Sequence, residues 1–524
     1  MKYLNNLILF IFFVSNLMAQ NAGPAGIGTT DGASSLQLWL NAGAISASDG
    51  DNVASWNDFS GYNHHLSQGN ATYQPVYRTS GINGLPGLEF SGYDGSSGEF
   101  MEDNDAENYL NNNNGITVVA IIKSDITNTD AGFLDTELPD GADDVLGIRY
   151  DASGANGGGT NNVKIGLSST GGDMQYESGS NSQSLLPQML VAGWTSGSGI
   201  SFFINGSEDI PTSGSSTRSG MINNTNRLII GKGPHDQNNN EGWDGLISEI
   251  LIYNQQLNAA QRTILENYYG LKYNLPIGND VFDESTYLTD ITGIGTVDGT
   301  VAHSASEGNG GGILLREFNS TLDEPNEFIF AAHEGAAASQ VITDLPDLTA
   351  PDALTGRSSR VWYIDRTEGT NSDISLGFNL LETGLSTGTD NQIYYLLYRS
   401  GTSGNFSLVP GAAGIALEGT VWVNVTNANL QDGYYSLARS NQTGRTWYSY
   451  NSGSWDNWQT WSLEAGGADI VNPENLTPTT SPTASVDKVV ILSPYKVTLT
   501  ANGKTNAVLE VRSGELDFGN TTGH

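Results

Sequence analysis

The chain has 524 residues and carries 57 acidic against 21 basic side chains, a formal net charge of −36. This charge argues against nucleic-acid binding, because counterion release needs clustered Lys and Arg, and against docking on anionic lipid. No cysteine is present, which excludes disulfides, thiolate metal sites and redox switching. Only 15% of the residues are charged, against about 25% in an average domain. The abundance of Gly, Asn, Ser and Thr in their place indicates strands and turns.

Residues 1–20, MKYLNNLILFIFFVSNLMAQ, have the features of a secretory signal peptide. Lys2 supplies the positive start, an apolar run extends from Leu7 to Val14, and Ala19 offers a small residue for cleavage. The apolar run is too short to span a bilayer. We therefore expect a secreted or bacterial cell-surface protein whose mature chain does not insert into a membrane.

Residues 30–277 predict a first β-sandwich. Asn-Gly and Asp-Gly pairs recur along the chain and tolerate the positive φ angles of tight hairpins, as at Asn205-Gly206. Short β-rich runs lie between such turns, at 115–123, 163–167, 189–194, 200–204, 227–231 and 246–253. Regular strands with these turns indicate a sandwich or a barrel. Trp39, Trp56 and Trp194 are expected to fill its core.

One segment of the first region predicts a helix. Asn258 is an N-cap candidate with Gln261 three positions on, the arrangement of a capping box. Ile264, Leu265 and Tyr268 share one face, and Gly270 can terminate the helix. We expect a short amphipathic helix on the edge of the sandwich.

Two further regions follow. Residues 278–440 carry strand candidates that predict a second β-sandwich of unknown function, at 312–318, 327–333, 360–365, 391–399, 421–425 and 434–439. Residues 441–524 contain a Pro/Thr/Ser-rich linker and short strand candidates about ten residues apart, at 488–492, 496–500 and 507–518. This spacing predicts the first rungs of a β-solenoid, which we expect to continue beyond His524.

The ends of the first region resemble a known family. SLQLWLNAG, NVASWNDFSGYNHHLSQ and QPVYRTSGINGLPGLEFSG, and later ISFFINGS, RLIIGKG and WDGLISEILIYNQQLNAAQRTILENYYGLKYNL, resemble laminin-G-like, concanavalin A-like lectin/glucanase domains of Bacteroidetes-type exported proteins. The resemblance implies a jelly-roll sandwich over residues 30–277. Residues 278–440 resemble a family of unknown function that follows such domains. WDNWQTWS, DKVVIL and KVTL resemble the start of repetitive surface-adhesin domains.

Carbohydrate binding is the function that this resemblance favours. Sugars are held by aromatic faces and by amide or carboxylate groups, commonly on loops. Candidate ligand-binding residues are therefore the polar and aromatic side chains of three loop segments: Tyr93, Tyr109, His235, Asp236, Asn238, Asn240 and Trp243. The expected partner is a polysaccharide or a surface glycoprotein.

Calcium is a possible cofactor, because it binds clustered hard oxygen ligands. Two oxygen-rich turns could supply them, through Asp49 and Asp51 in one and Asp140, Asp143 and Asp144 in the other. Neither turn has EF-hand spacing. The histidines do not predict a zinc site, because His64 and His65 are adjacent and would point to opposite faces of a strand.

An exported glycoside hydrolase or another component of polysaccharide utilisation is the alternative. Retaining glycosidases need two carboxyl groups about 5 Å apart. The nearest match to the Glu-x-Asp-x-x-Glu pattern of laminarinase-type enzymes is the run from Glu102 to Glu107, where Asn104 replaces the central Asp. We expect this run to be an acidic loop and predict no catalytic residue. The favoured hypothesis is a binding or adhesion protein with the later regions as spacers; a purely structural spacer is the third.

Overall fold

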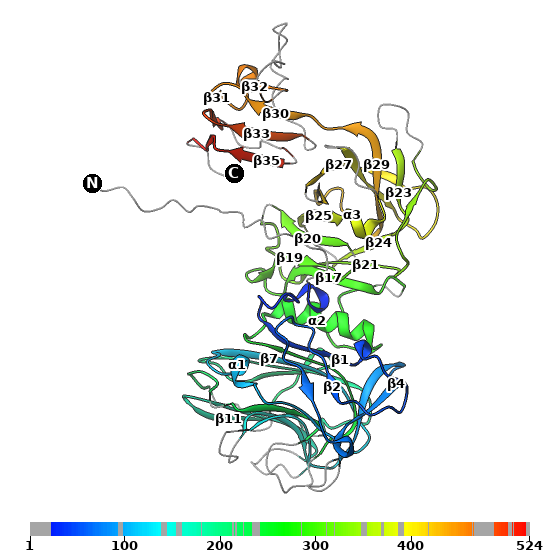
Figure 1. The fold of residues 1–524 in the computed structure, drawn as a ribbon, viewed down its shortest axis with the longest axis vertical. Helices are drawn as coiled ribbons and strands as arrows, with labels where there is room; N and C mark the ends of the chain where they lie inside the picture. The colour runs from blue at the N-terminus through cyan, green and yellow to red at the C-terminus, as the bar shows by residue number, and fades with distance from the viewer. Residues whose placement is uncertain are drawn as a thin grey trace, which may run out of the picture.

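The computed structural model confirms the all-β class, with a jelly-roll sandwich, a second β-sandwich and a partial β-solenoid in chain order (Figure 1). The structure describes residues 22–92, 98–137, 144–152, 160–179, 181–211, 214, 217–223, 225–232, 242–283, 286–310, 312–318, 320–346, 354–367, 371–385, 392–417, 419–463, 465, 487–500, 506 and 508–519. The expected signal peptide lies outside this part of the chain. No helix within it is both long and apolar enough to cross a membrane.

The first sandwich consists of two eight-stranded antiparallel sheets. The back sheet has the order β14-β13-β12-β7-β16-β5-β4, with β1 beside β16. Its strands are β1 (Leu36–Asn41), β4 (Val76–Ile82), β5 (Leu85–Ser91), β7 (Gly115–Ser124), β12 (Gln188–Thr195), β13 (Ser201–Ile204), β14 (Ser207–Glu208) and β16 (Asp244–Tyr253). Asn205 and Gly206 have φ of 48° and 70°, which confirms the tight hairpin between β13 and β14.

The front sheet has the order β11-β10-β9-β8-β15-β6-β3-β2. Its strands are β2 (Ser55–Trp56), β3 (Leu66–Ser67), β6 (Met101–Asp103), β8 (Ala131–Glu137), β9 (Asp144–Asp151), β10 (Asn162–Ser169), β11 (Gly172–Glu177) and β15 (Arg227–Ile230). One hydrophobic core fills the space between the sheets. Trp56 and Trp194 are fully buried in it, as expected, whereas Trp39 lies on the outer side of the back sheet.

The helix α2 (Ala259–Lys272) begins as predicted and ends later. The Asn258 side chain accepts from the Gln261 N–H (2.9 Å) and the Gln261 side chain accepts from the Asn258 N–H (3.1 Å), a complete capping box. Gly270 does not terminate the helix, which runs to Lys272. Its environment also differs from the expectation, because α2 packs between the two sandwiches and not on an exposed edge (Figure 1).

The second sandwich is one thirteen-stranded antiparallel sheet that folds back on itself, in the order β18-β17-β21-β24-β29-β26-β27-β28-β25-β20-β19 with β22 and β23 beside β29. Its strands are β17 (Thr289–Thr296), β18 (Ala302–His303), β19 (Ala305–Glu307), β20 (Ile313–Phe318), β21 (Glu327–His333), β22 (Gln340–Val341), β23 (Leu354–Ser358), β24 (Trp362–Arg366), β25 (Asp373–Asn379), β26 (Gln392–Arg399), β27 (Ser407–Leu417), β28 (Thr420–Val425) and β29 (Gly433–Thr443). The described short helices are α1 (Glu107–Leu110) and α3 (Leu380–Thr383), with 3-10 turns at Pro24–Gly26, Ala42–Ala44, Ala71–Tyr73 and Trp458–Thr460.

The last segment has parallel strand pairing, as a solenoid requires. Strand β33 pairs with β30 and β35, and β34 pairs with β31 and β36, all in parallel. The strands are β30 (Thr446–Ser449), β31 (Gly453–Ser454), β32 (Trp461–Ser462), β33 (Lys488–Leu492), β34 (Lys496–Thr498), β35 (Val508–Arg512) and β36 (Glu515–Asp517). Trp447, Trp455 and Trp461 fill the interior between these two small sheets.

The N-terminal segment Ala22–Gly28 lies between the sandwiches. Ala25 and Ile27 are buried in the same hydrophobic cluster as α2 and residues of both sandwiches. The main-chain oxygen of Ala25 accepts from the Ser306 hydroxyl of the second sandwich (3.2 Å), and that of Ile27 accepts from Tyr253 of the first (3.3 Å). This segment and α2 therefore join the two sandwiches through one continuous core.

Candidate ligand-binding face

Most residues of the predicted loop site lie outside the part of the chain that the structure describes. Tyr93, His235, Asp236, Asn238 and Asn240 lie outside the described residues. Asp140 and Asp143 also lie outside them, and of Asp144 only the backbone is described, at the start of β9. A binding role for these residues stays a prediction.

The two predicted aromatic ligand contacts that the structure describes are buried. Trp243 is fully buried and packs edge-on against Phe133 and Tyr150. Tyr109 is 3% exposed and stacks on His64, with ring centroids 4.0 Å apart. Both rings thus place their faces against protein in this structure.

The first predicted calcium turn is organised by protein partners. The Asp49 carboxylate accepts from the Thr79 N–H (3.0 Å) and lies 3.8 Å from the Arg78 guanidinium. The Asp51 carboxylate accepts from the Ser48 N–H (2.8 Å). Both side chains are exposed, and among the described residues no group of three or more His, Asp or Glu is arranged to hold a metal ion.

The acidic run at Glu102 is not the loop that we expected. Glu102 lies in β6 and its carboxylate is 2.7 Å from the Arg227 guanidinium of the neighbouring strand β15. Asp103 points the other way, into the core, where burial raises the pKa of its carboxyl group. Neighbouring strand residues face opposite sides of a sheet, so these two acids cannot form a catalytic pair.

The clearest candidate site is the outer surface of β9, β10 and β11. Residues of these strands that belong to the core alternate with residues that face away from it. We call the outward set the polar face; it consists of Arg149, Asp151, Lys164, Gly166, Ser168, Asp173, Gln175 and Glu177. Strand pairing places Gly166 directly between Gly147 and Gln175.

The centre of the polar face has no side chains. A Cβ atom at Gly166 would meet no other atom within 4 Å, so space is open above the main chain there. Gly147, its neighbour on β9, has no side chain either, but its main chain is buried. A glycine in a strand interior weakens the strand and often marks a place where a ligand approaches the backbone closely. The open space above Gly166, which we call the bare strip, is therefore the part of this face that can receive a flat molecule.

Ion pairs border the strip on one side. The Lys164 ammonium group lies 3.7 Å from the Asp151 carboxylate and 3.8 Å from the Glu177 carboxylate, and Arg149 lies 3.2 Å from Asp151. Both carboxylates are fully buried, whereas the Lys164 and Arg149 side chains are 12% and 14% exposed. Gln175 and Asp173 are exposed. A ligand would meet ammonium, guanidinium, amide and carboxylate groups here, which can all hydrogen-bond to hydroxyl groups.

Glu177 makes the stability of this face depend on pH. Burial, and then the charge of Asp151, raise the pKa of the Glu177 carboxyl group. A carboxyl group with a raised pKa binds its proton more tightly in the folded state. Its contribution therefore favours unfolding once the pH rises above the pKa that the group has in the unfolded chain. We expect Glu177→Gln to be more stable than the parent at neutral pH, with the difference shrinking towards pH 4; each unit of pKa shift is worth about 1.4 kcal/mol.

Urea unfolding of both proteins between about pH 4 and about pH 8 measures this difference. Glu510→Gln is a suitable control, because Arg512 and Lys488 lower the pKa of that carboxyl group. The Glu510→Gln variant should instead be less stable than the parent at neutral pH, with the difference shrinking as the pH falls. Equal pH profiles for Glu177→Gln and the parent would contradict the assignment.

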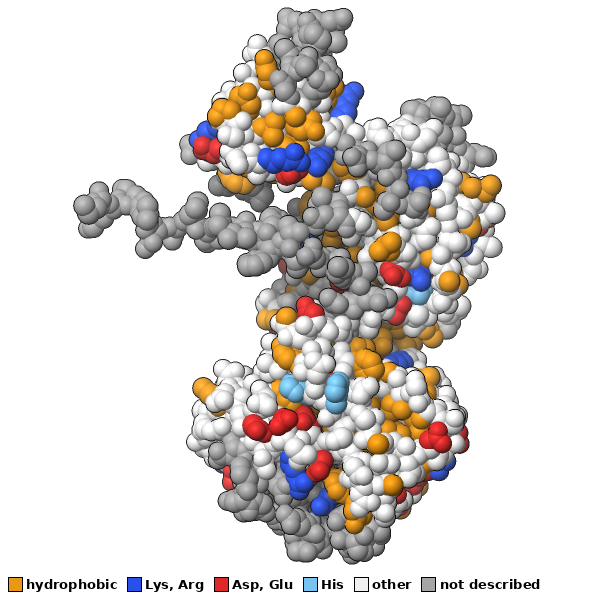
Figure 2. Space-filling model, in the orientation of Figure 1, with side chains coloured by type: hydrophobic (Ala, Val, Ile, Leu, Met, Phe, Trp, Pro, Cys, Tyr) orange, Lys and Arg blue, Asp and Glu red, His pale blue; other side chains and the backbone are white. Residues whose placement is uncertain are grey.

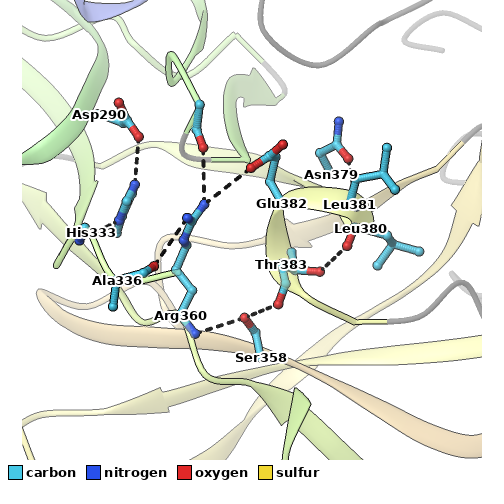
Figure 3. A network of polar contacts seen from close by, with 12 residues as sticks. Asp290, His333, Ala336, Ser358, Arg360, Asn379, Leu380, Leu381, Glu382 and Thr383 are labelled. Atoms are coloured by element: carbon cyan, nitrogen blue, oxygen red, sulfur yellow. Dashed lines mark hydrogen bonds and ion pairs between the residues drawn. The ribbon is translucent and has the colours of Figure 1, made fainter. Parts of the chain in front are cut away.

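A second polar cluster lies in the second sandwich and is structural (Figure 3). The Arg360 guanidinium donates to the main-chain oxygens of Gly310 (3.2 Å) and Ala336 (3.4 Å) and lies 4.0 Å from the Glu382 carboxylate. The side chain is 9% exposed. Arg360 therefore ties two loops to α3.

One family model matches part of the first sandwich. Residues 94–261 match the family model of the concanavalin A-like lectin/glucanases superfamily. This part of the chain forms a concanavalin A-like lectin/glucanase domain, which comprises most of the strands of both sheets. A comparison with curated proteins found no match.

Several solved structures show distant likenesses. Domain 4 of AbnA, an extracellular arabinanase of Geobacillus stearothermophilus solved with arabinotriose, is 15% identical with a TM-score of 0.29, over 44% of this chain and 97% of that domain. A Trypanosoma rangeli sialidase is 16% identical (TM-score 0.31; 44% of this chain and 32% of the sialidase). The binding domain of Paraclostridial Mosquitocidal Protein 1 is 12% identical (TM-score 0.31; 77% and 97%). Likenesses this distant say nothing about what the chain does.

The sequence did not single out the polar face. Lys164, Gly166 and Gln175 are ordinary residues of β-rich runs, without a motif. The one usable signal was alternation: apolar Val163, Ile165 and Leu167 on one face imply that the residues between them face outward. Only the pairing of β10 with β9 and β11 shows that two glycines and the charged side chains meet.

Proposed function

We propose that this protein is a secreted or cell-surface binding protein whose first sandwich holds a glycan on the polar face. The superfamily match supports carbohydrate binding. The observation that carries the proposal is the bare strip at Gly166, open above the backbone and bordered by hydrogen-bonding groups. An adhesive role, with the second sandwich and solenoid as spacers, completes the proposal.

The arrangement favours binding over hydrolysis. A retaining glycosidase needs a nucleophile and an acid that both reach the substrate. Asp151 and Glu177 are both fully buried and share one lysine as their cationic partner, and Glu102 pairs with Arg227. These carboxylates hold the basic side chains in place.

Gly166→Val tests the proposal. The position has space for the side chain, and valine suits a strand. The variant should therefore be as stable as the parent or more stable, with a gain of up to about 1 kcal/mol in the free energy of unfolding. The two methyl groups fill the bare strip, so binding should fall by at least about tenfold, the effect of losing roughly 1.4 kcal/mol. Gly401→Val is the matched control, because a Cβ atom at that glycine of the second sandwich would also meet no atom within 4 Å and its backbone is not in the left-handed region.

Binding is measured on a glycan array and then by calorimetry, with and without EDTA. Loss of binding in Gly166→Val but not in Gly401→Val supports the polar face. Unchanged binding in Gly166→Val would refute it. Release of reducing sugar that disappears on Glu102→Gln would show a hydrolase instead, and loss of binding in EDTA would support the calcium prediction.

A further inference from the structure

We infer that the ligand of the polar face is a neutral, hydroxyl-rich glycan, bound through hydrogen bonds and without stacking on an aromatic ring. This inference rests on the proposed function and adds the chemical class of the ligand to it. Three features of the described residues carry it: the pairing of the cations, the position of the aromatic rings and the charge around the face.

Each basic side chain at the polar face already has an acidic partner. Lys164 lies between Asp151 and Glu177, and Arg149 pairs with Asp151. Farther along the same sheet Arg227 pairs with Glu102. A carboxylate or sulfate ligand would have to displace an existing partner and leave a buried carboxylate without its cation, which is costly. The face therefore offers no spare positive charge for an anionic ligand.

Arg218 is another cation near this edge of the sheet. Its Nε atom donates to the main-chain oxygen of Asp173 (2.8 Å) and a terminal nitrogen donates to that of Thr217 (3.1 Å). Asp173 itself, in β11, also carries an exposed carboxylate. A charged ligand would thus meet Asp173 as well as Arg218, and repulsion would offset attraction.

The aromatic rings of these strands face the core. Phe133 of β8, Tyr150 of β9 and Tyr176 of β11 are all buried between the sheets. Among the described residues of the polar face there is no aromatic side chain, so a sugar ring would lie on the main chain of the bare strip. The groups around it include donors such as Lys164 and acceptors such as Asp173, and the Gln175 amide can both donate and accept hydrogen bonds. A hydroxyl group also donates and accepts, and so fits this surface.

The protein as a whole also disfavours anionic ligands. Its formal net charge is −36. In the view of Figure 2 most of the described surface is uncharged, and many of the basic side chains lie beside acidic ones. A polyanion approaching such a surface gains little from any basic cluster and is repelled by the excess of acids.

The test compares soluble neutral polysaccharides, such as a β-glucan, a xylan and a mannan, with polygalacturonate and a sulfated glycan. The full chain is used, and affinity is measured from about 0.01 M to about 1 M NaCl, which shortens the Debye length from about 30 Å to about 3 Å. We expect binding to a neutral polysaccharide with a Kd that changes less than about threefold over this range, because no net charge is neutralised. We also expect no affinity for anionic polymers.

Gln175→Lys adds a positive charge beside the bare strip. For a neutral ligand this change should leave affinity the same or weaken it, whereas an anionic ligand should bind more tightly, and only at low salt. Gly166→Val separates the proposal that the polar face is the binding site from the inference that its ligand is neutral. Binding confined to anionic polymers, steeply salt-dependent and blocked by Gly166→Val, would overturn the neutral-ligand inference and keep the polar face. Binding of any ligand that Gly166→Val does not weaken would overturn the polar face itself.

Discussion

Replacing Glu249 with alanine should lower the free energy of unfolding by roughly 3–5 kcal/mol, the cost of breaking a buried charge pair. Glu249 lies in β16, is fully buried and faces α2. Its carboxylate accepts from Trp39 Nε1 (3.0 Å), from the hydroxyls of Tyr269 and Tyr273 (2.8 Å each) and from the Lys272 ammonium group. Alanine would leave these four donors without their acceptor in the core.

Lys272 makes the loss larger than that of ordinary hydrogen bonds. Burial alone would lower the pKa of Lys272, but the Glu249 carboxylate outweighs it and the pKa is raised. Without Glu249 a charged lysine would remain among Tyr268, Tyr269 and Tyr273, whose ring centroids lie 5.5–5.8 Å from its nitrogen. The double variant Glu249→Gln with Lys272→Met should therefore be more stable than Glu249→Ala.

Equilibrium urea unfolding measures these effects. Asp125→Ala is the control, because Asp125 pairs with Lys123 at 2.6 Å but both side chains are partly exposed, and such pairs are worth about 1 kcal/mol or less. A Glu249→Ala variant no less stable than Asp125→Ala would show that the four donors find other partners.

Replacing Gly26 with valine should separate the N-terminal segment from the sandwiches. Gly26 has a φ of +77°, and a Cβ atom there would lie 1.9 Å from the Ser306 hydroxyl and 2.7 Å from that of Thr292. A strained backbone costs about 1–3 kcal/mol and overpacking about 1–3 kcal/mol, so the variant should lose roughly 2–6 kcal/mol. The segment should also become sensitive to proteases.

Gly84→Val isolates the backbone contribution. Gly84 has a similar φ of +87°, but a Cβ atom there would meet nothing within 4 Å. Its substitution should cost only the backbone strain, about 1–3 kcal/mol. Thermal unfolding and limited proteolysis compare the two variants. Equal stability, with an intact N-terminal segment in both, would contradict the view that Ala22–Gly28 holds the sandwiches together.

Local features of the sequence were predictable and the structure bears them out. The Asn258–Gln261 capping box and the hairpin at Asn205-Gly206 each depend on residues a few positions apart. The predicted helix end at Gly270 was wrong for a tertiary reason. Gly270 packs closely against Ile277, where a Cβ would lie 3.0 Å from that side chain, so the glycine serves helix packing and does not end the helix.

The sequence by itself determined that this chain alternates strands and tight turns, lacks thiol chemistry and carries an excess of acid. Tertiary structure alone decided that Trp39 donates to Glu249, 210 residues away, that α2 is enclosed between two sandwiches and that Gly166 stands open beside Lys164. The physical reason is that alternation, capping and turns are set by interactions within a few residues. The choice of neighbouring strands, and hence of which outward side chains form a surface together, depends on how distant segments bury their apolar faces.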